Sequence, residues 1–156
     1  MIITKLDFEN DFENIAWIQK KHAKSIYDSL LPEQKKIQNL SILEEREINR
    51  KQYFKPNQTV LIASINNSTI GFIWYEIVRS NFTNDDFGYI LDIYVEESHR
   101  KNGIGNDLIA NMKKEIVILG INRIDLNVSN NNKAIKLYEK IGFVKTMQKM
   151  CLLFEE

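Results

Sequence analysis

The chain has 156 residues, which fits one domain, and we expect residues 1–156 to fold as a single unit. Its 44% hydrophobic content predicts a core that closes without disulfides or a structural metal. Basic and acidic residues both number 21, so the net charge is zero and does not favour nucleic-acid binding.

The amino-terminal part is predicted to be a short strand followed by a helix. Ile2 to Leu6 is β-branched, and a helical pattern begins near Asp11 and runs to about Tyr27. Acidic residues occur where a signal peptide would be apolar, and no apolar run reaches membrane length. The protein is therefore not expected to enter a membrane. The lone Cys151 cannot form an internal disulfide, which implies a reducing compartment, so we expect a cytoplasmic protein.

The middle of the chain is predicted to be helical first and β-sheet afterwards. Pro32 opens a second helical region that extends to about Tyr53. A β-hairpin is predicted from TVLIASI and TIGFIWYEIV, which are joined by a polar turn at residues 66–68. The run GYILDIYVEE predicts another strand, largely apolar and therefore central in the sheet.

The last third predicts helices that alternate with strands. Residues 103–119 carry a helical stripe of apolar side chains that ends at Gly120, a typical carboxy-terminal cap. The next strand is predicted at RIDLNV, and the next helix at NKAIKLYEKIG, ended by Gly142. One or two closing strands are expected from FVKTMQKMCLLF, so the fold class is α/β.

The sharpest local feature is the glycine-containing loop RKNGIG, residues 100–105, between a predicted strand and a predicted helix. Amides at a helix start lack intrahelical acceptors, and glycines let phosphate oxygens approach the main chain, so a pyrophosphate suits this place. An ordinary turn is an equal alternative on the loop alone. A dinucleotide fingerprint needs a small residue at Leu108, and a Walker loop needs Gly-Lys-Ser/Thr, so both fit poorly.

Arg100, Gly103 and Gly105 match the Gln/Arg-x-x-Gly-x-Gly/Ala loop of the GCN5-related N-acetyltransferase (GNAT) family, which this chain resembles. The strand LDIYV precedes the loop as in the family, and NNKAIKLYEKIGF resembles the second family signature. The resemblance implies a mixed, mainly antiparallel central sheet, splayed between strands 4 and 5 and flanked by helices. It also implies acetyl-coenzyme A (acetyl-CoA) in that opening as co-substrate, and no metal.

The resemblance assigns roles by position. Tyr138 matches the tyrosine that protonates the leaving sulfur, although packing in the core is an alternative for it. Asn131 matches a cofactor-contacting asparagine, with Asn127 and Asn132 as substitutes because the register is ambiguous. The implied cofactor-binding residues are Ile93, Tyr94, Val95, Arg100, Lys101, Asn102, Gly103, Ile104, Gly105, Asn106, Asn131 and Tyr138.

The group that takes the proton from the acceptor's ammonium is left open. Asp92 and Glu76 lie on adjacent predicted strands, and either can act directly or through water. His99 is expected to lie near phosphate rather than near the thioester. His22, on the first helix, is expected to face solvent or the acceptor, and Trp74 is expected to be a packing residue.

The expected acceptor is a small amine of the polyamine or amino-sugar type. Family members that acetylate protein amino termini carry a longer final hairpin with tyrosines, whereas no tyrosine follows Tyr138 here. A protein or peptide acceptor and a non-catalytic acyl-CoA-binding module are the alternatives. Monomer and homodimer are both open, with Met147, Met150 and Leu152 as a contact surface for a second copy.

Overall fold

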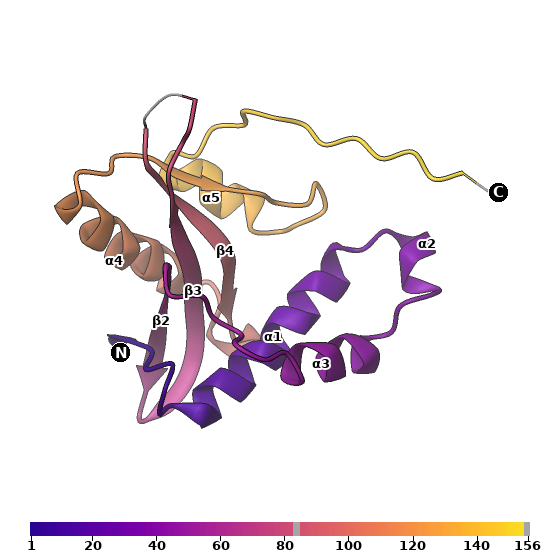
Figure 1. Ribbon diagram of the computed structural model, residues 1–156, viewed down its shortest axis with the longest axis horizontal. Helices are drawn as coiled ribbons and strands as arrows, with labels where there is room; N and C mark the ends of the chain where they lie inside the picture. The colour runs from indigo at the N-terminus through magenta and orange to yellow at the C-terminus, as the bar shows by residue number, and fades with distance from the viewer. Residues whose placement is uncertain (83–84, 155–156) are drawn as a thin grey trace.

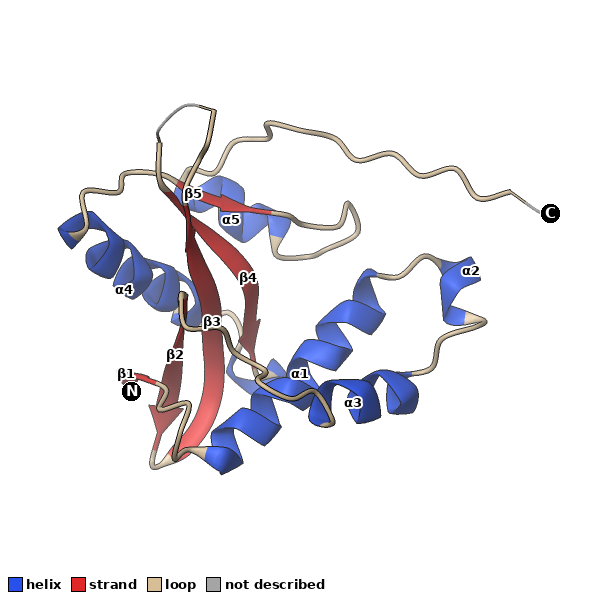
Figure 2. Cartoon of the chain, viewed as in Figure 1, coloured by secondary structure: helices blue, strands red, loops and turns tan. Residues whose placement is uncertain are grey.

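The computed structural model describes residues 1–82 and 85–154. Within them the chain forms one five-stranded sheet with helices on both faces (Figures 1 and 2). In chain order the elements are β1 (Ile2–Lys5), α1 (Phe12–Ser29), α2 (Pro32–Lys35), α3 (Leu40–Ile48), β2 (Gln58–Ile65), β3 (Ser68–Val78), β4 (Phe87–Val95), the 3-10 helix η1 (Glu97–His99), α4 (Ile104–Ile118), β5 (Ile124–Leu126) and α5 (Ile135–Ile141). None of these helices is both long enough and apolar enough to cross a membrane.

The sheet follows the order of the chain, β1-β2-β3-β4-β5, and is mixed. The first four strands pair antiparallel, and β5 pairs parallel to β4. The β4–β5 ladder covers only Gly88–Ile90, whereas β4 stays paired with β3 as far as Val95. Because β5 ends at Leu126, opposite Ile90, β4 has no strand partner on that side beyond Ile90, in agreement with the predicted opening between strands 4 and 5.

The core has two layers because strand side chains alternate between the two faces of the sheet. Val60 and Ile62 of β2 pack on the α1 side with Ile18. Leu61 of β2 packs on the opposite side with Leu108 of α4. Ile18 and Leu108 are both fully buried, and burial of such a side chain stabilises the fold by about 1.5–3 kcal/mol.

The predicted hairpin is confirmed, and its turn explains why it closes tightly. Ile65 pairs with Ser68, so only two residues form the connection. Asn66 and Asn67 have positive φ values of 50° and 64°. Two such residues in succession define the turn that matches the right-handed twist of paired strands, and asparagine tolerates this conformation.

Two expectations about helices and strands are wrong. The second helical region is two helices, because Asn39 caps a new helix by accepting a hydrogen bond from the Ile42 amide. The closing strands are not formed in the described residues: Val144 to Phe154 contains neither helix nor strand. β5 is only three residues long and offers a short edge, and side chains such as Met147 are almost wholly exposed.

Candidate active site

The unpaired edge of β4 beyond Ile90 carries main-chain groups that face the splay. The amide of Glu96 donates to the Ile70 carbonyl on β3 at 2.8 Å. Because successive residues of a strand present their main-chain groups to opposite sides, those of Ile93 and Val95 point away from β3. The Val95 carbonyl accepts a hydrogen bond from the Arg100 Nε at 2.8 Å, which ties the following loop to the strand end.

A bulge in β4 determines on which face of the sheet the Asp92 side chain lies. The β3–β4 register shifts so that Leu91 is the extra residue between Ile90 and Asp92. After the bulge Ile93 packs in the α4 core, while Asp92 sits opposite Trp74 on the α1 face. If residues 90 to 92 alternated regularly, with no bulge, Asp92 would point into the apolar α4 core like Ile90.

The glycine loop ends where α4 begins, as predicted. Gly103 is the N-cap residue with φ +80°, and a Cβ added there would meet nothing within 4 Å. The Asp107 amide is the first to bond back into the helix, donating to the Gly103 carbonyl at 3.0 Å. The amides of residues 104–106 therefore precede the helical ladder and suit an anion.

The other residues of the glycine loop surround the start of α4. Lys101 and Asn102 are exposed, and Lys101 has φ +65°. A Cβ on Gly105 would come within 3.1 Å of Leu137, so glycine here lets α5 approach α4 closely. The Arg100 guanidinium lies 5.6 Å from the centre of the Tyr94 ring, which places Tyr94 beside the loop.

Tyr138 lies on α5 and is 7% exposed. It packs in the α4 core with its ring 5.8 Å from that of Phe143. Burial, and then the negative charge of Asp92, raises the pKa of the Tyr138 hydroxyl to about 12. The phenol carries its proton at neutral pH, as an ordinary tyrosine does, and burial extends this protonated range to higher pH.

The three successive asparagines before α5 differ in what they do. The Asn132 side chain accepts from the Ala134 amide at 2.8 Å, and its carbonyl accepts from Ile135 at 3.2 Å. Asn132 thus starts the helix turn, whereas Asn130 and Asn131 are exposed. The side chain of Asn131 is not used in building this turn.

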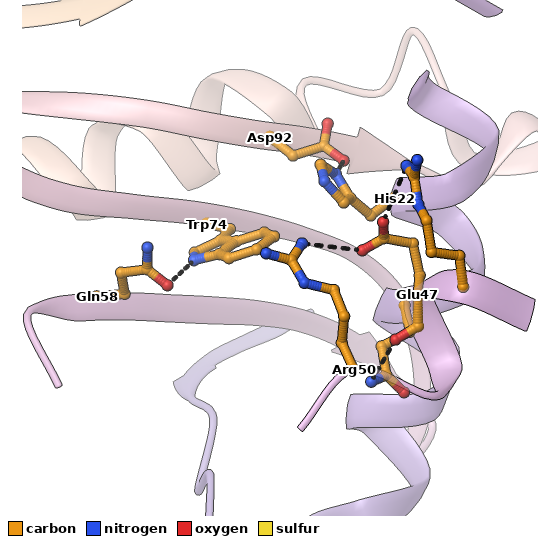
Figure 3. A network of polar contacts seen from close by, with 8 residues as sticks. His22, Glu47, Arg50, Gln58, Trp74 and Asp92 are labelled. Atoms are coloured by element: carbon orange, nitrogen blue, oxygen red, sulfur yellow. Dashed lines mark hydrogen bonds and ion pairs between the residues drawn. The ribbon is translucent and has the colours of Figure 1, made fainter. Parts of the chain in front are cut away.

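A contact that the sequence did not predict joins α1 to β4. The His22 Nδ1 lies 2.8 Å from the Asp92 Oδ2, and the His22 ring packs edge-on against Trp74 at 5.1 Å (Figure 3). A signal was available, because His22 lies four residues after the buried Ile18 and so falls on the buried stripe of its helix. What could not be foreseen is the bulge that turns Asp92 towards it.

Glu76 and His99 have other neighbours. The Gln58 amide donates to the Glu76 carboxylate at 3.1 Å, and the Trp74 indole N–H donates to the Gln58 carbonyl oxygen at 3.1 Å. His99 lies in η1 with its Nδ1 3.0 Å from the Ser98 hydroxyl. Over residues 1–82 and 85–154 no group of three or more His, Cys, Asp or Glu side chains could hold a metal ion.

Residues 23–143 match the sequence profile of the Acetyltransferase (GNAT) family. The L-ornithine N5-acetyltransferase NATA1 of Arabidopsis thaliana is 33% identical over 73 residues, which are 46% of this chain and 32% of that protein. The chain thus matches about a third of the length of that curated relative.

Solved structures share the fold. A ribosomal-protein-alanine N-acetyltransferase from Brucella melitensis biovar Abortus 2308 aligns with a TM-score of 0.67 at 18% identity, covering 99% of this chain and 100% of that one. An aminoglycoside acetyltransferase from an uncultured soil metagenomic sample, in complex with sisomicin, aligns with a TM-score of 0.69 at 15% identity, covering 99% and 95%.

The described residues thus combine a five-stranded mixed sheet, a glycine loop at a helix start and a buried tyrosine in one α/β fold. The profile match covers well over half of the chain, so the chain belongs to the GNAT family of acetyl-CoA-dependent N-acetyltransferases.

Proposed function

We propose that this protein transfers an acetyl group from acetyl-CoA to a primary amine, and that the acceptor is a small molecule. The observation that carries the proposal is the free edge of β4, residues 91–95, which runs directly into a glycine loop at the start of α4. The unpaired amides of this edge are followed directly along the chain by the anion-binding start of α4. Binding of a pantetheine arm together with its pyrophosphate requires these two features side by side.

The residues present fit acetyl-CoA. The open space over Gly103 and the free amides of residues 104–106 suit the pyrophosphate, with the side chains of Arg100, Lys101, Asn102 and Asn106 around it. The main-chain groups of Ile93 and Val95 suit the pantetheine arm and the thioester oxygen. Asn131, exposed before α5, is the asparagine that we assign to the cofactor.

Tyr138 supplies the proton in this proposal. Bound acetyl-CoA contributes a thioester carbon open to attack by an amine and a sulfur that leaves. A phenol is protonated at neutral pH even at its ordinary pKa of about 10, and burial raises the pKa of Tyr138 further, to about 12. It is therefore the acid, and a thiol rather than a thiolate departs.

The acceptor class is supported by two similarities and is compatible with the conformation of Val144 to Phe154. One relative is named as an L-ornithine N5-acetyltransferase, and one similar structure is an aminoglycoside acetyltransferase in complex with sisomicin. Val144 to Phe154 forms no hairpin over the site that would hold a peptide main chain. Because one similar structure is named for a ribosomal protein, a protein acceptor is the second candidate.

The test mixes the protein with acetyl-CoA and a panel of L-ornithine, spermidine, sisomicin and short peptides, and follows thiol release. We expect rapid release with a small amine and a 10²–10³-fold lower kcat for Tyr138→Phe, the range typical of a lost acid catalyst. Release with peptides alone would move the acceptor class to proteins. Binding of acetyl-CoA without release for any amine would indicate an acyl-CoA-binding module.

We also propose that the protein forms a homodimer through its carboxy-terminal segment. Met147, Met150 and Leu152 are 92%, 87% and 83% exposed, which is unusual for apolar side chains on one short segment. A second copy would cover them. Sedimentation of the wild type beside a Met147→Lys, Met150→Lys double variant measures this, and equal masses for both proteins would contradict it.

A further inference from the structure

A carboxylate–imidazole pair lies where the free edge of β4 meets α1. The two residues are 70 positions apart in the chain, and the Nδ1 to Oδ2 distance is 2.8 Å (Figure 3). The side chains of His22 and Asp92 keep 17% and 11% of their surface exposed. The pair is thus packed into the protein but has not lost contact with solvent.

The pairing fixes which imidazole nitrogen can take a proton. A carboxylate accepts hydrogen bonds, so Asp92 favours the tautomer in which Nδ1 carries the hydrogen. The lone pair then resides on Nε2. The Trp74 ring, edge-on at 5.1 Å, limits rotation of the imidazole. This is the arrangement in which a histidine acts as a base with a carboxylate behind it.

The other carboxylates on the α1 face are engaged differently. Glu47 is 1% exposed and lies 3.3 and 3.5 Å from the guanidinium groups of Arg46 and Arg50. Glu96 lies 2.7 Å from the Lys21 ammonium. The Glu76 carboxylate accepts from the Gln58 amide. Among the carboxylates just named and Asp92, only Asp92 faces an imidazole.

The charge of Asp92 also acts on Tyr138, the proposed acid. Asp92 directly precedes Ile93, whose main-chain groups face the splay. The charge of Asp92 contributes, after burial, to the raised pKa of Tyr138. The Tyr53 hydroxyl is buried, and after burial the neighbouring Glu47 carboxylate raises its pKa most.

We propose that His22 is the general base of the acetyl transfer and that Asp92 positions it, an inference that rests on the proposed function. The imidazole Nε2 takes one proton from the acceptor's ammonium. The C–N bond of the amide then forms as the C–S bond breaks, and the sulfur receives the Tyr138 proton. The second proton of the attacking nitrogen restores the phenol through solvent, and the imidazolium releases its proton.

His22→Asn separates catalysis from structure, because the asparagine amide can donate to Asp92 as Nδ1 does but cannot take a proton. With the fastest amine of the panel, we expect kcat/KM 10²–10³-fold below wild type and an unchanged Kd for acetyl-CoA. The wild-type kcat/KM should depend less on alkaline pH than that of the variant, because the imidazole takes the proton from bound ammonium. In His22→Asn it should keep rising into alkaline pH, because only amine already neutral in solution reacts.

Charged side chains on the elements packed around His22 include Asp92 of β4 and Glu47 of α3, the latter paired with Arg46 and Arg50. Figure 3 shows His22, Asp92, Glu47 and Arg50 together. Lys21→Met serves as the structural control, since it breaks another polar contact of α1, the Lys21–Glu96 ion pair just after β4. Activity within about twofold of wild type is expected for it. An equal loss of activity in Lys21→Met and His22→Asn would overturn the proposal, because loosened packing of α1 against β4 would then explain both losses.

A second measurement does not depend on turnover. The ¹⁵N spectrum of the imidazoles, with His22 assigned by its loss in His22→Asn, reports which ring nitrogen carries the hydrogen. We expect hydrogen on Nδ1, and Asp92→Asn should shift that signal. Hydrogen on Nε2 would overturn the assignment of the base. If no amine in the panel reacts, the proposed function fails, and the spectrum still decides whether the pair has the geometry of a base.

Discussion

A few side chains determine what the free edge of β4 offers to a ligand. Gly103 gives the loop its left-handed conformation, and the bulged Leu91 turns Asp92 towards α1. Tyr138 is buried on α5 with its proton held by a raised pKa. Each of these residues acts through its conformation or its burial, so single substitutions test their roles directly.

Gly103→Ala should weaken acetyl-CoA binding about tenfold or more. A left-handed φ costs a residue with a Cβ about 1–2 kcal/mol, and the loop can escape that cost only by moving its amides. Calorimetric titration with acetyl-CoA measures the effect.

Gly120→Ala is the matched control for this loop. Gly120 has φ +78° and, like Gly103, nothing within 4 Å of an added Cβ, but it lies after the other end of α4. Both variants should lose a similar free energy of unfolding, and only Gly103→Ala should lose affinity. Equal affinities would show that the loop does not hold the pyrophosphate.

At the scale of elements, the hairpin of β2 and β3 is the part whose formation is most local. Its two-residue turn has positive φ at both positions, where glycine is favoured over other residues. Asn67→Gly should therefore raise the free energy of unfolding by about 0.5–1 kcal/mol. Urea unfolding measures it, with Ser68→Gly, outside the turn, as a control that should not stabilise. A fall in stability for Asn67→Gly would contradict the assigned turn.

Sequence patterns predicted the elements that depend on local chemistry. The hairpin turn, the glycine loop and α4 each have a signal in a few neighbouring residues, and each is present. The bulge at Leu91 has no such signal, because it depends on how β3 and β4 register over their whole length. The His22–Asp92 contact follows from that bulge and was missed with it. The closing strands were predicted from β-forming residues alone, but strands need an edge to pair with, and β5 is three residues long.

At the scale of the whole molecule, two cores share one sheet and each contains buried tyrosine. Tyr138 and Tyr75 belong to the α4 side, and Tyr53 to the α1 side. Burial is the first cause of the raised pKa in all three, with a nearby carboxylate adding to it. The protein therefore keeps these phenols neutral where an unfolded chain would ionise them.

Stability should fall as the pH rises from about 10, the ordinary tyrosine pKa, towards 12. In this window the unfolded chain has lost the phenol protons and the folded protein retains them, so alkaline pH favours unfolding. For Tyr138, whose folded pKa is about 12, the contribution is about 2 kcal/mol. Denaturant unfolding across this range should give a shallower decline for Tyr138→Phe, and an identical decline would contradict the raised pKa.

The most direct test of the central claim is to look for the transferred group itself. The protein is incubated with acetyl-CoA bearing a deuterated acetyl group and with L-ornithine, spermidine and sisomicin together, and the amines are analysed by mass spectrometry. The account predicts that one of these amines gains the deuterated acetyl group in wild type and does so far more slowly with Tyr138→Phe. An absence of labelled amine, although acetyl-CoA binds, would contradict the claim that this chain transfers acetyl groups to small amines.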